Sequence, residues 1–387
     1  MTTFRPAVRD IASWIRAKLV PSVRPRTVAR DHDARVTWYR DVVRPRILST
    51  PPVKGTTDPV CEIHVLTSAR DCLNAMWSLK SFYAVSRRRY SLCIHDDGSL
   101  GTEEFLLLRK HFPDARVIAR VEADWTTEGR LSRFPRSRLF RAVNPFGIRL
   151  VDFHEYLRAD RLVVLDSDVL FFDTPVEFLR RVEDPAYRLN TFNADVMASG
   201  YTTTFAEQEP ASTFPHFDAA AVRAQVGFDL QPRLNAGFGL VHRGSIPLEW
   251  IEEFLALPGI DLAIRNGRAG DRRSAIQFFL IEQTLVALCS SRFGVELLPK
   301  DYDVVLTPGL GARSVRHYIG TIRDLMYTEG LARLVRRGFL DGNWPPASEA
   351  CPVTATGVRR AVRYHSDVDS MPSRSAMDEV QPRPASR

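Results

Sequence analysis

Short apolar runs alternate with helix-length segments along residues 60–260 of the chain. The runs at 61–66, 90–95 and 115–118 have the length and the content of β-branched and aliphatic residues that are typical of buried strands. Between the first two runs, Cys72, Met76, Leu79 and Tyr83 recur at the spacing of one helical face. This alternation predicts right-handed βαβ crossovers, and hence an α/β fold with a mainly parallel central sheet flanked by helices.

Two acidic residues, Asp166 and Asp168, directly follow a further apolar run at 162–165. In open α/β sheets, ligands bind beyond the carboxyl ends of the strands. Carboxylates one residue apart can share a Mg²⁺ or Mn²⁺ ion, which also accepts phosphate oxygens. Residues Thr174 to Glu177 fit a capping box with Pro175 at the first helical position. We therefore expect a strand, an acidic turn and a helix, although such a triplet alone also fits a solvated turn.

Several later segments also carry candidate site residues. The run at 234–242 reads as a buried strand whose small residues allow close approach of backbone or ligand. A helix expected over 274–289 contains Glu282 and Gln283, which fit either a partly exposed turn or a catalytic pair. His317 could ligate a divalent ion, and Gly320 suits a loop that folds over phosphate.

Arginines are frequent between residues 120 and 149, which is the pattern of a solvated face. Arg149 differs because it begins the apolar stretch that leads into the acidic strand. A guanidinium at that place could reach the same site and bind phosphate through two parallel hydrogen bonds.

The 387 residues contain 44% hydrophobic and 26% charged residues, as is ordinary for a globular protein, and carry a net charge of +7. The charge favours anionic partners such as nucleotides, acidic lipids or phosphorylated substrates. We expect no nucleic-acid partner, no signal peptide and no membrane span. Five widely separated cysteines favour a reducing compartment, and hence a cytoplasmic location. The first strand is not followed by G-x-G-x-x-G or G-x-x-x-x-G-K, which excludes the usual dinucleotide and P-loop sites.

The composition divides the chain into three parts. Residues 1–55 form a basic helical and connector segment, 56–345 a catalytic domain, and 346–387 a polar tail expected to be disordered. Residues 9–20 have a basic amphipathic pattern that fits either packing on the domain or peripheral contact with an anionic membrane. Residues 184–232 fit either a substrate loop or a structural insertion.

Taken in order, the motifs of residues 60–330 resemble those of the family-8 glycosyltransferases and their bacterial relatives. The motifs are a strand ending in Thr67, Arg149 one helix before the acidic strand, LDxDV at 165–169, NxG at 235–237, an acidic residue and Gln at 282–283, LPxxY at 298–302, and HxxGxx followed by a basic residue at 317–323. The sequence departs from the family pattern in having Glu282 for Asp, Asp303 for Asn and Arg323 for Lys.

The resemblance implies the type-A nucleotide-diphospho-sugar transferase fold and a role for each matching residue. By this resemblance, Mn²⁺ or Mg²⁺ would be bound by Asp166, Asp168 and His317, and the nucleobase would lie near Thr67. The donor sugar would lie near Arg149 and Asn235, and the diphosphate under a closing loop with Gly320 and Arg323. The anomeric carbon would lie near Gln283 and Glu282.

The expected activity is metal-dependent transfer of a sugar from a nucleoside-diphosphate donor, a UDP-sugar, to an unidentified hydroxyl acceptor with retention of configuration. One alternative is a catalytically silent protein that binds nucleotide-sugar or glycan. Another is a phosphotransferase of the haloacid-dehalogenase type, although Leu170 stands where that family has Thr or Val. A sugar nucleotidyltransferase would need a glycine-rich first loop, and residues 67–71 contain no glycine.

Overall fold

The computed structural model describes residues 33–195, 205–206, 217–231, 233–269 and 272–341. The amphipathic segment at 9–20 and the tail at 346–387 lie outside the described residues, as does much of the 184–232 excursion. Within the described ranges, no helix is long and apolar enough to cross a bilayer. Cys61, Cys72, Cys93 and Cys289 are buried free thiols.

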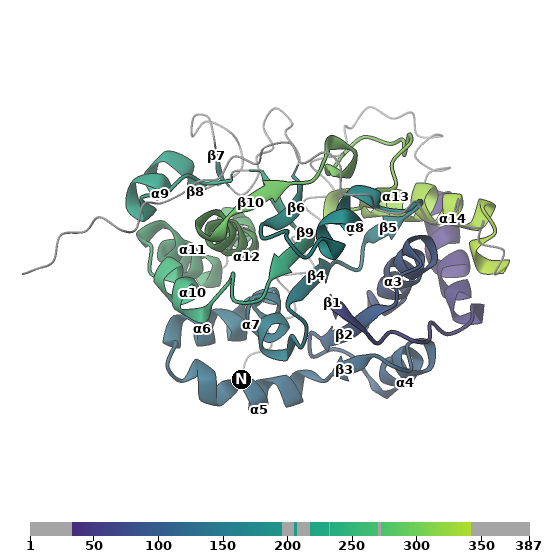
Figure 1. The fold of residues 1–387 in the computed structure, drawn as a ribbon, viewed down its shortest axis with the longest axis horizontal. Helices are drawn as coiled ribbons and strands as arrows, with labels where there is room; N and C mark the ends of the chain where they lie inside the picture. Colours follow the sequence, from purple (N-terminus) through teal and green to yellow (C-terminus); the bar gives the residue numbers. More distant parts are fainter. Residues whose placement is uncertain (1–32, 196–204, 207–216, 232, 270–271, 342–387) are drawn as a thin grey trace, which may run out of the picture.

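A seven-stranded sheet forms the centre of the molecule (Figure 1). Its strands, in spatial order, are β10 (Val295–Leu297), β6 (Asn190–Ala194), β9 (Leu234–His242), β4 (Arg161–Leu165), β1 (Asp58–Thr67), β2 (Tyr90–Asp96) and β3 (Arg116–Ile118). Strand β9 runs antiparallel to both of its neighbours, and the other pairs are parallel. This confirms the expected α/β architecture with a mainly parallel sheet.

Helices cover both faces of this sheet, which gives three layers (Figure 1). Alternate residues of β4 show why: Val163 and Leu165 point into one apolar core, whereas Leu162 and Val164 point into the other. The first core is closed by α3 (Cys72–Ser86), α4 (Thr102–His111), α8 (Val176–Glu183) and α14 (Ala332–Arg336). The second is closed by α6 (Pro135–Val143), α7 (Gly147–Tyr156), α10 (Leu248–Leu255), α11 (Pro258–Ala269) and α12 (Arg272–Phe293).

The remaining elements are short or peripheral. They are helices α5 (Arg120–Leu131), α9 (Ala219–Val226) and α13 (Arg323–Leu325), the paired strands β7 (Phe205–Ala206) and β8 (Phe217–Asp218), and the short 3-10 or π turns η1 (Tyr39–Val43), η2 (Arg44–Ser49), η3 (Lys300–Tyr302), η4 (Gly320–Ile322), η5 (Met326–Leu331) and η6 (Phe339–Asp341). Turns η1 and η2 lie in the segment expected to be a connector. They pack on the domain, because Ile47 is buried in its core and the Trp77 Nε1 donates to the Arg44 carbonyl at 2.9 Å.

A second, two-stranded sheet follows the acidic turn. Strand β5 (Val169–Phe171) pairs antiparallel with β11 (Val315–His317), and His317 lies opposite Val169. The expected order of strand, turn and helix was therefore incomplete, because this three-residue strand precedes α8. Its residues are fully buried and too few to show a period.

Two further expectations are corrected by the structure. Thr174 does not cap α8; its hydroxyl donates to the Val85 carbonyl at 2.9 Å, and Pro175 occupies the N-cap. Residues 190–194, assigned to the excursion, form β6, an entirely buried strand of the seven-stranded sheet. In both places a tertiary contact outweighs the local pattern.

Candidate active site

Asp166 and Asp168 stand at the carboxyl end of β4, as expected from the sequence. The turn is held against β9, because the Asp166 amide donates to the Gly237 carbonyl at 2.8 Å. Strands β1 and β4 are parallel neighbours, so the end of β4 lies beside the end of β1, where Thr67 is buried. The acids therefore lie at the edge of the sheet where α/β proteins bind ligands.

His317 reaches the two acids through the pairing of β11 with β5. Its Nε2 lies 3.1 Å from Asp168 Oδ1 and 3.7 Å from Asp166 Oδ2. Its Nδ1 lies 2.9 Å from Asn235 Oδ1, which also accepts the Gly237 amide at 3.0 Å. Because an amide oxygen only accepts, Nδ1 carries the proton and Nε2 faces the carboxylates.

Gly237 gives the imidazole its room. A Cβ at this position would lie 2.2 Å from His317 Cε1 and 2.7 Å from Asp166 Oδ2. The NxG motif therefore has two tasks here: the asparagine orients the histidine, and the glycine admits it.

Two arginines hold the outer oxygens of the same carboxylates. Arg149 Nη1 lies 3.1 Å from Asp166 Oδ1, and Arg323 Nη2 donates to Asp168 Oδ2 at 2.8 Å. The second Arg323 nitrogen donates to both oxygens of Asp71, at 2.9 and 3.1 Å. Arg323 thus leaves Asp168 Oδ1 facing the histidine, whereas Arg149 Nη1 also donates to Asp166 Oδ2 at 3.5 Å.

These three side chains fit a divalent cation. One ligand atom each from Asp166, Asp168 and His317 lie within 4.8 Å of one another. Two carboxylate oxygens and one imidazole nitrogen suit Mn²⁺ or Mg²⁺, and the Asn235 and arginine contacts orient these ligands from behind.

The charges around the acids differ in their effect. Burial opposes ionisation of Asp168, but Arg323 and His317 outweigh it and lower the pKa of this carboxyl. Burial dominates at Asp166 and raises its pKa, despite Arg149 and His317 nearby. Burial works against the charged imidazole, yet the neighbouring acids raise the pKa of His317. A bound cation would occupy His317 Nε2 in place of the proton that the raised pKa favours there.

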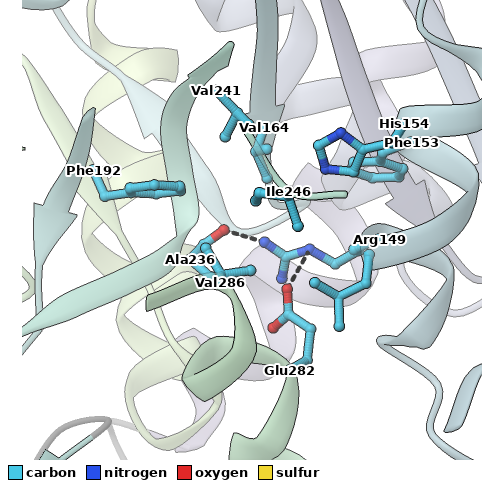
Figure 2. Close-up of a pocket in the computed structure, with 11 residues that line it drawn as sticks. Arg149, Phe153, His154, Val164, Phe192, Ala236, Val241, Ile246, Glu282 and Val286 are labelled. Carbon is cyan, nitrogen blue, oxygen red and sulfur yellow. Dashed lines mark hydrogen bonds and ion pairs between the residues drawn. The ribbon is translucent and has the colours of Figure 1, made fainter. Parts of the chain in front are cut away.

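Arg149 also connects the acids to a small apolar cavity behind them (Figure 2). Its guanidinium donates to the Ala236 carbonyl, and its Nε lies 3.5 Å from Glu282 Oε1. Burial raises the pKa of Glu282 to about 7, although Arg149 works against this rise. Figure 2 shows Glu282 facing Arg149 at this cavity, and Val164, Phe192 and Val286 also contribute to its lining.

Gln283 points to a different part of the site. Its Oε1 accepts the Ala236 amide at 3.2 Å, and its Nε2 donates to Asp195 Oδ2 at 3.0 Å. The two members of the helical pair are thus separated in role, with Glu282 bound to Arg149 and Gln283 placed between β9 and the end of β6. Gly320 is exposed at the start of η4, three residues before Arg323.

Sequence reasoning missed Asp71 and Asp195. Asp71 immediately precedes α3, where an aspartate looks like an ordinary helix cap, but its side chain makes no capping bond and binds Arg323 instead. Asp195 adjoins the long excursion and gave no local signal. Both were detectable only through partners distant in the chain.

No family model matches this sequence, and no curated protein matches it. Among solved structures, the chain is similar to the mouse xyloside xylosyltransferase 1 at 10% identity, covering 66% of this chain and 96% of that one with a TM-score of 0.39. It is similar to the galactosyltransferase LgtC, solved with donor and acceptor sugar analogues, at 15% identity over 74% of this chain and 98% of that one (TM-score 0.40). It is also similar to core-mannan synthase A of Aspergillus fumigatus in its Mn/GDP form, at 11% identity over 65% and 76% (TM-score 0.33).

Proposed function

We propose that this protein is a metal-dependent glycosyltransferase that moves a sugar from a nucleoside-diphosphate donor, a UDP-sugar, to a hydroxyl acceptor with retention of configuration. The observation that carries the proposal is the convergence of Asp166 Oδ2, Asp168 Oδ1 and His317 Nε2 at the carboxyl end of β4. Arg149 and Arg323 hold the two carboxylates in place.

Asp166, Asp168 and His317 would hold Mn²⁺ or Mg²⁺, which stabilises negative charge on a departing diphosphate. Arg323 lies beside that point and can transfer one or both of its donor edges from Asp71 and Asp168 to phosphate oxygens. Such contacts strengthen as the leaving group gains charge, so they favour the transition state over the bound donor.

The acidic residue beside Gln283 is a poor candidate for a covalent nucleophile. Glu282 is only 4% exposed, and its carboxyl faces the Arg149 guanidinium. Gln283 is held by Ala236 and Asp195, which supports a role in positioning the sugar. We therefore favour same-face attack by the acceptor hydroxyl, assisted by the leaving phosphate. Thr67 near the nucleobase, Asn235 near the sugar and Gly320 over the diphosphate stay predictions, as do a cytoplasmic location and membrane contact through residues 9–20.

The test is a thermal-shift panel of UDP- and GDP-sugars, each with and without Mn²⁺, followed by an assay for released nucleoside diphosphate. We expect stabilisation by a UDP-sugar only with Mn²⁺, and release that stops in excess chelator. Asp168→Asn should abolish both, whereas the exposed Asp301→Asn should change neither. Binding without any release would instead establish a silent nucleotide-sugar-binding protein, and full activity of Asp168→Asn would refute the assigned site.

A further inference from the structure

A second cluster of residue types that can bind metal lies on one face of the sheet, on strands other than the one that carries the acids. His64 lies on β1, and Cys93 and His95 lie on β2. His64 is the register partner of Cys93, and Leu66 is the partner of His95, so the three side chains share one face of the sheet. One nitrogen of each imidazole and the Cys93 Sγ lie within 4.8 Å of one another, and each residue is at most 1% exposed.

A carboxylate lies beside the first histidine. Glu62 Oε2 lies 3.2 Å from His64 Nε2, at an ion-pair distance without hydrogen-bond geometry. The same carboxylate is held by the Arg116 guanidinium at 2.6 Å and the Arg158 amide at 2.8 Å. An acid therefore stands at the His64 nitrogen opposite the one that faces His95, as acids do behind histidines that bind metal.

The two imidazoles face each other. His95 Nε2 lies 3.0 Å from His64 Nδ1, and both rings are fully buried. These two nitrogens therefore lie close enough to share one ion.

We propose that His64, Cys93 and His95 bind one Zn²⁺ ion between β1 and β2. Two nitrogens on a tetrahedral zinc ion are about 3.3 Å apart, so the pair observed at 3.0 Å would need to separate by only a few tenths of an ångström. Imidazole and thiolate ligands select zinc over Mg²⁺ and Mn²⁺. Zinc binds the thiolate, so binding must release the Cys93 thiol proton as the S–Zn bond forms.

The ion would fix the helix that carries a site residue. The Phe153 ring of α7 packs on both imidazoles, with its centroid 5.3 Å from that of His64 and 4.7 Å from that of His95. Arg149 stands one turn earlier on the same helix and binds Asp166. Zinc at this place would therefore hold α7, and with it Arg149, against the sheet. Because the cluster is enclosed, zinc would be bound as the chain folds.

The test uses the full chain without a polyhistidine tag, expressed in medium supplemented with Zn²⁺ and dialysed against a chelator. We expect one equivalent of zinc in the wild type and in Asp168→Asn, in which the acidic site is disabled. Cys93→Ala and His95→Gln should lose it, whereas Cys289→Ala, which removes a buried cysteine of α12, should retain it.

Protein expressed with Co²⁺ gives a second readout. A cobalt–thiolate bond produces a near-ultraviolet charge-transfer band, which we expect in the wild type and in Asp168→Asn. Absence of retained zinc and of this band in folded wild type would overturn the proposal and leave a hydrogen-bonded histidine pair only. Zinc retained in Cys93→Ala at the wild-type stoichiometry would equally overturn it.

Discussion

Replacing Arg323 with alanine should change the binding of cation and of diphosphate in opposite directions. In the structure Arg323 donates to Asp168 Oδ2 and to both oxygens of Asp71. A cation must bind Asp168 against that positive charge, so its removal should strengthen Mn²⁺ binding. A diphosphate needs the same guanidinium, so removal should weaken UDP binding.

The contacts set the size of both effects. Arg323 makes three ionic hydrogen bonds, at 2.8, 2.9 and 3.1 Å. Such bonds contribute about 1.5–3 kcal/mol each, so transferring one of them to phosphate corresponds to a change of roughly 10- to 100-fold in Kd. We expect UDP to bind the variant 10- to 100-fold more weakly at saturating Mn²⁺, and uridine to bind within about twofold. Without nucleotide, Mn²⁺ should bind at least about tenfold more tightly.

Titration calorimetry measures all three affinities, with Arg180→Ala as the control. Arg180 is a half-exposed arginine of α8 that pairs with Glu177, so its loss should leave every affinity unchanged. Equal weakening of UDP and uridine would remove Arg323 from the phosphate contact. Weaker Mn²⁺ binding in the variant would refute the competition for Asp168.

Two further changes test the surroundings of the site, and a third tests a buried lysine of α3. Gly237→Ala should displace His317 or Asp166, which should reduce Mn²⁺ affinity and lower the free energy of unfolding by about 1–3 kcal/mol. The control Gly129→Ala, with open space around its Cβ, should stabilise α5 by up to about 1 kcal/mol in thermal unfolding. Asn235→Ala should weaken Mn²⁺ binding about 10- to 100-fold, while Asn235→Asp keeps an acceptor for His317 Nδ1 and should restore most of it; equal losses would show that the acceptor is irrelevant. Burial lowers the pKa of Lys80 from 10.5 to about 8, so between these pH values the unfolded chain binds more protons than the folded one. Denaturant titrations should therefore show the wild type gaining stability over Lys80→Met toward pH 10.5, by at most about 3 kcal/mol. A stability difference that does not change with pH would contradict the buried charge.

The sequence predicted those parts of the fold whose signals are local. The helical period around Cys72 gave α3, and the apolar runs before Asp166 and around Gly237 gave β4 and β9. The position of Asp166 and Asp168 at a strand end followed from the same run. Strand β5 was missed because its three buried residues are too few to show alternation, and β6 because Asn190, Thr191 and Asn193 interrupt its apolar pattern. The cap assigned to Thr174 was wrong because its hydroxyl bonds to Val85 instead.

The residue types of the site were determined by the sequence alone: two acids, a histidine, an asparagine and two arginines, in an order that can be read along the chain. Which atoms meet was decided by tertiary structure. The pairing of β11 with β5 brings His317 to acids about 150 residues earlier, and the approach of α13 to α3 joins Arg323 to Asp71 and Asp168. These contacts depend on strand register and helix packing over long separations, and such long-range geometry has no periodic signature in a single sequence.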